Sequence, residues 1–136
     1  MTNAAATAPA RLLNLKRLGL GIVAAIVVNL VVYAVGSAAG ATWIANGQAV
    51  GWFMVPIATV IAMAIGGVIT WLLARRWDKA TITMAWVGLV FAVISVPGPL
   101  LGSTDTPTRW ALATMHITTG IIWFVVVYPF RSTREA

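Results

Sequence analysis

Four long apolar segments constrain the fold of this chain more than any other feature. They lie at about residues 18–39, 52–74, 80–101 and 108–130, separated by short polar connections. An α-helix of about 20 residues, rising about 1.5 Å per residue, crosses about 30 Å of hydrocarbon. None of the segments alternates as a barrel strand does. The sequence therefore predicts an all-α membrane protein, a four-transmembrane-helix bundle.

Composition supports this fold class and gives one domain. The chain is 60% hydrophobic and 9% charged, whereas about a quarter of the residues of a soluble domain are charged. The tails at 1–17 and 131–136 are too short to form domains. We therefore expect residues 1–136 to form a single membrane domain, with the lipid bilayer as its main partner.

The basic residues predict the orientation. Eight of the nine lie on one side of the four segments, and only Arg109 lies on the other. The eight are Arg11, Lys16, Arg17, Arg75, Arg76, Lys79, Arg131 and Arg134. The positive-inside rule then makes both termini and the 75–79 loop cytoplasmic, in a multi-pass protein of the cell (plasma) membrane. Such one-sided charge predicts that any homo-oligomer is parallel; an unidentified membrane partner is the alternative.

Charge and cysteine content exclude several classes of function. The net charge is +6, but the basic residues end apolar runs and form no patch interleaved with aromatic residues, so no nucleic acid is expected. The absence of cysteine excludes disulfides and thiolate metal sites. We expect no cofactor and no metal site.

A secretory signal peptide is a competing interpretation of the N-terminus, with cleavage near Ala39–Ala41. The apolar run is longer than the 7 to 15 residues typical of a signal-peptide core, and it contains Asn29. A retained first helix is therefore favoured.

Small residues and aromatic residues predict how the helices are placed. Small side chains let helices approach closely in lipid, and three stripes favour a packed bundle over a pore lining. The stripes are Gly21, Ala25, Asn29; Ala58, Ala62, Gly66, Thr70; and Ala85, Gly88, Ala92, Ser95. Aromatic side chains anchor in the membrane interfaces. Those expected at the outer interface are Trp43, Trp52 and Trp110, and those at the inner one are Trp71, Trp77, Tyr128 and Phe130.

The third and fourth segments carry the unusual residues. Pro97, Gly98 and Pro99 should break the third helix and release carbonyls. The only histidine, His116, lies at about the depth of this break. The neutral ring is expected to donate to a freed carbonyl or to Ser95, tying the third helix to the fourth.

Together, His116, Ser95 and Asn29 form a candidate intramembrane polar site. An ionisable residue inside a membrane is by default a hypothesis about function. Three functional alternatives therefore stay open beside the structural one: a proton-accepting group, a single metal or haem ligand, and part of an outward crevice. Before the fourth helix, Thr106 is expected as the N-cap, and Asp105 pairs with Arg109 or is simply solvated.

The residues of the spans argue against an enzyme. The three acidic residues, Asp78, Asp105 and Glu135, all lie outside the spans, so no membrane-embedded carboxylate is available. No nucleophile has both a base and an orienting partner, so we assign no catalytic residue. The sequence predicts a non-enzymatic accessory or structural membrane protein. The alternative is a small transporter or channel with an outward-facing polar site near His116.

Two motifs also carry a resemblance to a known family. The third segment ends with S-x-x-G-P-L (Ser95, Gly98, Pro99, Leu100), and the fourth opens with R-W-A-L-x-x-M-H (Leu112, Met115, His116). In this order the chain resembles a family of small actinobacterial four-helix membrane proteins designated only as a domain of unknown function. The resemblance implies a four-helix membrane fold and no activity, substrate or catalytic residue.

Overall fold

The computed structural model describes residues 13–130, and 75% of these residues are helical. The helices are α1 (Leu15–Ala38), α2 (Met54–Ala74), α3 (Ala80–Ser95), α4 (Pro97–Gly102) and α5 (Thr106–Val127). Two short strands, β1 (Ile44–Ala45) and β2 (Gln48–Ala49), lie between α1 and α2. With α3 and α4 taken as one span, four helices are long and apolar enough to cross a membrane. The predicted all-α, four-helix architecture is confirmed.

Local capping explains where the first and last helices begin. The first begins at Leu15 because the Asn14 side chain accepts a hydrogen bond from the Arg17 amide at 3.0 Å. The last begins at Thr106, and its N-cap is Asp105, whose side chain accepts from the Thr108 amide. The prediction of Thr106 as the N-cap is therefore wrong by one residue.

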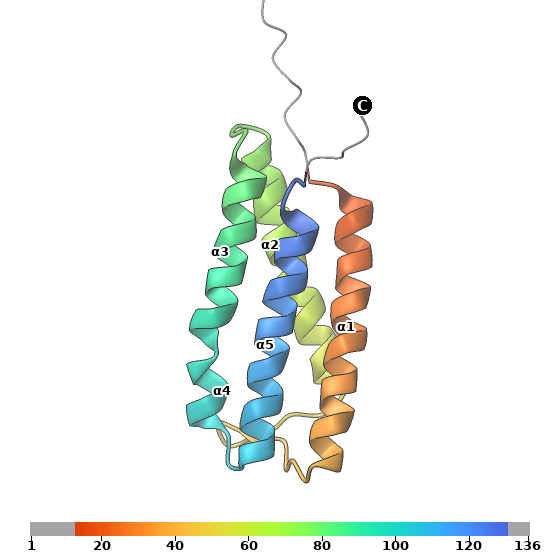
Figure 1. The fold of residues 1–136 in the computed structure, drawn as a ribbon, viewed down its shortest axis with the longest axis vertical. Coiled ribbons are helices and arrows are strands. Elements are labelled where there is room, and N and C mark those ends of the chain that lie inside the picture. The colour runs from red at the N-terminus through yellow and green to blue at the C-terminus, as the bar shows by residue number, and fades with distance from the viewer. Residues whose placement is uncertain (1–12, 131–136) are drawn as a thin grey trace, which may run out of the picture.

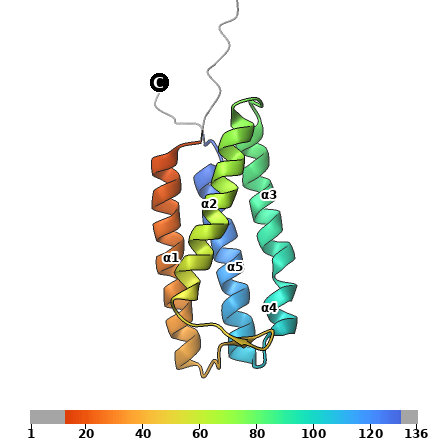
Figure 2. The ribbon, with the colours of Figure 1, turned by 180° about the vertical axis from the view of Figure 1, so that it is seen from behind.

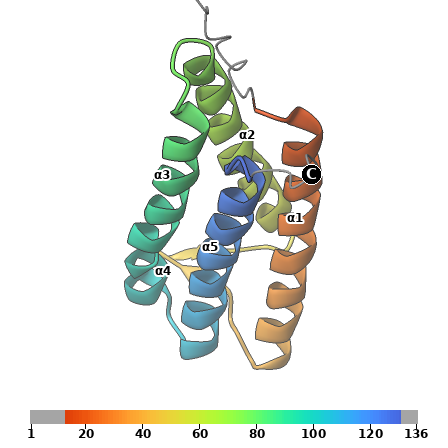
Figure 3. The same ribbon diagram turned by 45° about the horizontal axis from the view of Figure 1, so that its top comes forward.

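Helix α5 is the centre of the bundle. Figure 1 shows it between α1 and α3, and the view from behind in Figure 2 shows α2 covering the opposite side. The tilted view in Figure 3 shows that the start of α1, the end of α5 and the α2–α3 connection lie at one end of the bundle. The connections before α2 and before α5 lie at the other end.

The outward surface of the bundle is apolar. Large side chains on it include Leu20, Phe91 and Ile94, which are 73%, 71% and 68% exposed. Water would penalise so much exposed apolar surface, whereas lipid tails solvate it without penalty. The inward surface instead carries small and polar residues, among them Ala25, Ala85 and Asn29, with 0%, 0% and 2% exposure. The chain is thus built as a membrane protein, with an apolar exterior and closely approaching helices.

The predicted inward face of the second helix is wrong at Ala58 and Ala62 but correct at Thr70, which is buried, and at Gly66, which faces Trp123. Ala58 and Ala62 are exposed, whereas the buried face of α2 follows a neighbouring row. That row is Val55, Thr59, Met63, Gly67, Thr70 and Ala74. A helix that is apolar on all sides gives no periodic pattern to mark its buried face, so only contacts with its neighbours determine its rotation.

Two glycines, Gly66 and Gly88, leave room for Trp123, the largest buried side chain of α5. The Trp123 indole is 5% exposed and donates from Nε1 to the Met84 carbonyl of α3 at 2.9 Å. A Cβ added at Gly88 would lie 2.1 Å from Trp123 Nε1, and one added at Gly66 would lie 2.8 Å from the ring. The indole therefore fills space that exists only because α2 and α3 carry glycine at these positions.

A small hairpin, formed by β1 and β2, closes one end of the bundle. This end is opposite to the one where α1 starts. Asn46 and Gly47, with φ of 51° and 74°, form its turn, a combination typical of two-residue hairpins. The turn and strand join the segment after α4: the Asn46 amide donates to the Gly102 carbonyl at 2.8 Å, and Ala45 bridges Ser103. The hairpin thus connects the α1–α2 loop to the α4–α5 loop.

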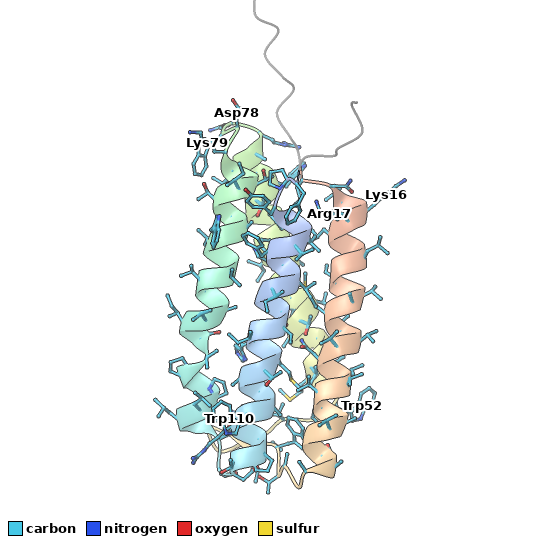
Figure 4. All side chains as sticks on the ribbon, in the orientation of Figure 1. Lys16, Arg17, Trp52, Asp78, Lys79 and Trp110 are labelled. Atoms are coloured by element: carbon cyan, nitrogen blue, oxygen red, sulfur yellow. The ribbon has the colours of Figure 1, made fainter. Side chains whose placement is uncertain are left out.

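Trp43 directly precedes the first strand of this hairpin in the sequence. The prediction that it anchors at the lipid interface is wrong. Trp43 is 7% exposed and stacks on Tyr33 with ring centroids 3.9 Å apart. Its indole Nε1 donates to the Ser37 hydroxyl at 2.9 Å, so both its apolar ring and its polar group are used inside the protein. By contrast Trp52 and Trp110 are each 63% exposed and lie at this end, as Figure 4 shows.

Candidate functional site

Asn29 is the centre of a polar cluster in the middle of the bundle. Its Nδ2 donates to the Thr59 hydroxyl of α2 at 3.1 Å and to the Thr119 hydroxyl of α5 at 2.9 Å. Its Oδ1 accepts from the Thr118 hydroxyl of α5 at 2.9 Å. One side chain on α1 therefore bonds to two other helices.

The hydrogen-bonding capacity of this cluster is used within it. Both amide hydrogens of Asn29 have acceptors, and its oxygen has a donor. Thr59 in turn donates to the Val55 carbonyl of its own helix, and the single hydrogen of the Thr118 hydroxyl is shared between Asn29 and the more distant Met115 carbonyl, at 3.2 Å. Asn29 is 2% exposed. A buried cluster satisfied in this way ties helices together and leaves Asn29 no free group for a ligand.

His116 bonds within its own helix. Its Nδ1 lies 2.8 Å from the Leu112 carbonyl, and because a carbonyl only accepts, Nδ1 carries the hydrogen. The expected bond from His116 to Ser95 or to a freed carbonyl of the third helix is therefore wrong. In a neutral ring Nε2 is then an acceptor, and it has no partner among residues 13–130.

The structure does not join the three predicted site residues by hydrogen bonds. Ser95 donates to the Ala92 carbonyl at 2.7 Å, within α3. The helical hydrogen-bond pattern stops after Ser95 and resumes at Pro97, at the proposed position of the break. In a regular helix the Val93 carbonyl would accept from the amide of residue 97, but Pro97 has no amide hydrogen. The Val96 amide donates to the Val93 carbonyl instead, in a tighter turn. The Val93 carbonyl is therefore satisfied locally, without His116.

We expect His116→Ala to lower the free energy of unfolding by less than about 0.6 kcal/mol, the average for a hydrogen bond between membrane helices. The Leu112 bond is confined to one helix, so its loss does not separate helices. Thermal unfolding in detergent, with His116→Gln as the comparison, measures this. A severe and equal loss of folded protein in both variants would instead indicate a cofactor ligated by the ring.

Sequence reasoning missed a second polar cluster, centred on Asp105 beside the hairpin. The carboxyl accepts hydrogen bonds from the Thr108 amide at 2.8 Å and the Thr108 hydroxyl at 2.7 Å, and also from the Thr42 hydroxyl. These hydrogen bonds hold the pKa of the Asp105 carboxyl well below its usual range, and the bond from the Thr42 side chain has the largest effect. Arg109 does not pair with Asp105: its Nε donates to the Ser103 carbonyl at 3.0 Å.

Acid should weaken the fold through Asp105. Because its folded-state pKa is lowered, its stabilising effect is complete above the unfolded-state pKa of about 3.9 and is lost as the pH falls below that value. Asp105→Asn still caps α5. In this variant the unfolding temperature should fall less steeply than in the wild type as the pH is lowered from about 5 to about 2. Asp78→Asn, an exposed carboxyl at the opposite end, is the control. An unchanged acid dependence in Asp105→Asn would contradict the assignment.

The described residues offer little for a metal or a large ligand in the membrane interior. Within residues 13–130 no group of three His, Cys, Asp or Glu side chains is placed to hold a metal ion. Two of the hollows that residues 13–130 form bear on this question. One of about 260 Å³ lies among the start of α1, the start of α3 and the end of α5, and one of about 390 Å³ lies on the outer face of α3. Neither is lined by Asn29, Ser95 or His116.

Comparison with protein families identifies a family for this chain and adds no activity. The model of DUF6069, a family of unknown function, matches residues 9–133. Comparisons with curated proteins and with solved structures give no match. The family match covers all four spans and confirms the resemblance to a family of unknown function. The chain therefore belongs to the DUF6069 family.

Proposed function

We propose that this protein is a non-enzymatic accessory protein of the plasma membrane. The observation that carries the proposal is the cluster around Asn29, because this buried amide uses its hydrogen bonds to join α1, α2 and α5. A transport site would instead need a polar group free to exchange its partner for a substrate. The transporter or channel alternative depends on His116, whose Nδ1 is held by its own helix.

A flux assay distinguishes these two functions. The purified chain is reconstituted into vesicles, and proton and potassium flux are compared with those of protein-free vesicles. We expect no difference for the wild type, for His116→Ala or for Thr114→Ala, an exposed control on the same helix. Flux that His116→Ala abolishes and Thr114→Ala leaves intact would overturn the proposal in favour of a channel or transporter.

The proposed orientation places both termini and the 75–79 loop in the cytoplasm. The support is the one-sided distribution of the basic residues. In Figure 4, Lys16, Arg17 and Lys79 lie together at one end of the bundle, and Trp52 and Trp110 lie at the other.

Thiol labelling tests this orientation cleanly, because the chain has no cysteine. Gln48, in the hairpin, and Asp78, in the α2–α3 loop, are both exposed and lie at opposite ends. On intact cells an impermeant thiol reagent should label Gln48→Cys and leave Asp78→Cys unlabelled until the membrane is permeabilised. The reverse pattern would invert the assigned topology.

The same variants test the proposed parallel homo-oligomer. If copies associate with one orientation, an oxidant or short cross-linker in native membranes should join Gln48→Cys to Gln48→Cys of another copy. Membranes containing both Gln48→Cys and Asp78→Cys copies should give no mixed product, because these residues lie at opposite ends of the bundle. Mixed dimers would show antiparallel association. A chain that stays uncross-linked in both assays would point to a different membrane partner.

A further inference from the structure

The hollow of about 260 Å³ at the basic end of the bundle has polar residues in its walls, and one of them has no hydrogen-bond partner in the described part of the chain. Asn14 and Arg17 contribute from the start of α1, and Thr81 contributes from the first turn of α3. Val126 and Val127, near the end of α5, form part of its apolar lining. The hollow therefore brings together hydrogen-bond donors from two helices above the apolar interior.

Thr81 is the feature that points to a ligand. It is 3% exposed, and its hydroxyl, which is shielded from solvent, has no hydrogen-bond partner within the described part of the chain. Other buried threonines behave differently. Thr59 and Thr70 donate to the carbonyls of Val55 and Gly66, four residues earlier in their own helix. A buried hydroxyl without a partner is costly, so a ligand that supplies one would be favoured here.

Arg17 gives the hollow its charge. Its guanidinium donates to the Tyr128 carbonyl at 3.2 Å and to the Val125 carbonyl, and it lies 5.5 Å from the centre of the Phe130 ring. These contacts fix the group at the end of α5 and use two of its five N–H donors. The remaining donors are available to an anion held beside it.

The first turn of α3 supports the same ligand class. No side chain caps this helix start, so its first amides add partial positive charge near Thr81. Asn14 uses its Oδ1 as the cap of α1, accepting from the Arg17 amide, which leaves its side-chain NH₂ as a further donor. Among residues 13–130, those that line the hollow include one cation and no carboxylate. An anion with several acceptor oxygens is the chemistry that matches this set.

We propose that this hollow binds a phosphate group, with Arg17 as the charged ligand and the Thr81 hydroxyl as a hydrogen-bond donor. The group is carried by an anionic phospholipid headgroup or is free inorganic phosphate. The inference goes beyond the accessory role and does not depend on it. The basic end of the bundle is where the phosphates of the adjacent membrane surface would be found, and the hollow lies at that end.

The test compares unfolding temperatures of the full chain in uncharged detergent. One arm adds inorganic phosphate, with chloride at equal ionic strength as its reference. The other arm adds phosphatidylglycerol, with phosphatidylcholine as its reference. A ligand that binds only the folded state raises the unfolding temperature in a saturable way. Stabilisation by the lipid alone would identify a headgroup as the source, and stabilisation by both would identify phosphate itself.

Thr81→Val separates ligand binding from folding. Without a ligand this variant should be as stable as the wild type or more stable, because it removes a buried hydroxyl that has no partner. It should weaken phosphate binding by roughly tenfold, as expected on losing a hydrogen bond to a charged group. Thr81→Ser keeps the hydroxyl and should retain binding.

Thr83→Val is the matched control, because Thr83 is two residues further along α3 and lines the other hollow. Thr83→Val should bind phosphate or phosphatidylglycerol as the wild type does. The proposal is overturned if neither phosphate nor phosphatidylglycerol stabilises the wild type, or if Thr81→Val responds to them as the wild type does.

Discussion

Asn29→Ala is expected to lower the free energy of unfolding by about 2 kcal/mol, because it removes three hydrogen bonds between helices at an average of about 0.6 kcal/mol each. The three partners are Thr59, Thr118 and Thr119. Thr59 and Thr118 keep their bonds to backbone carbonyls, so the variant should fold with a looser bundle and should not collapse.

Unfolding in mixed micelles, followed by circular dichroism, measures this loss. Thr114→Ala, a polar residue exposed on α5, is the control and should change the free energy of unfolding by less than about 0.5 kcal/mol. Thr119→Ala should reproduce part of the loss, and combining it with Asn29→Ala should cost less than the sum of the two single changes. Full stability of Asn29→Ala would show that the cluster does not hold the helices together.

Gly88→Ala should be similarly damaging, for a steric reason. The added Cβ would lie 2.1 Å from Trp123 Nε1, so the indole must move and its bond to the Met84 carbonyl is strained or lost. Overpacking of this kind typically costs about 1 to 3 kcal/mol. Gly19→Ala is the matched control: it adds the same atom to a helix where nothing lies within 4 Å. It should leave stability unchanged or raise it slightly.

A double-mutant cycle shows whether Trp123 is the cause. Trp123→Phe removes the indole nitrogen that the new methyl group would meet, so Gly88→Ala should cost clearly less in that background. Thermal unfolding of the four chains in one detergent gives the coupling free energy. An equal cost of Gly88→Ala in both backgrounds would mean that a contact other than Trp123 accounts for it.

The candidate site could be predicted only in part. The sequence identified Asn29 as unusual, because an amide inside an apolar span needs partners in lipid. It did not identify Thr59, Thr118 and Thr119 as those partners. Which threonines meet an asparagine depends on the rotation and relative height of three helices. The same limit led to the incorrect expectation that His116 bonds to the third helix, since its Nδ1 found an acceptor one turn away at Leu112.

The sequence alone determined the number and the approximate bounds of the spans, because the hydrophobic length needed to cross a membrane is a local property of the chain. It also indicated the helix interruption at Pro97, since a missing backbone donor acts wherever the residue stands. Only the tertiary structure decided that α2 turns Thr59 and Met63 inward, because each of its faces is apolar. Likewise, Trp43 is buried against Tyr33 because the hairpin holds it there, a contact between segments that composition does not specify.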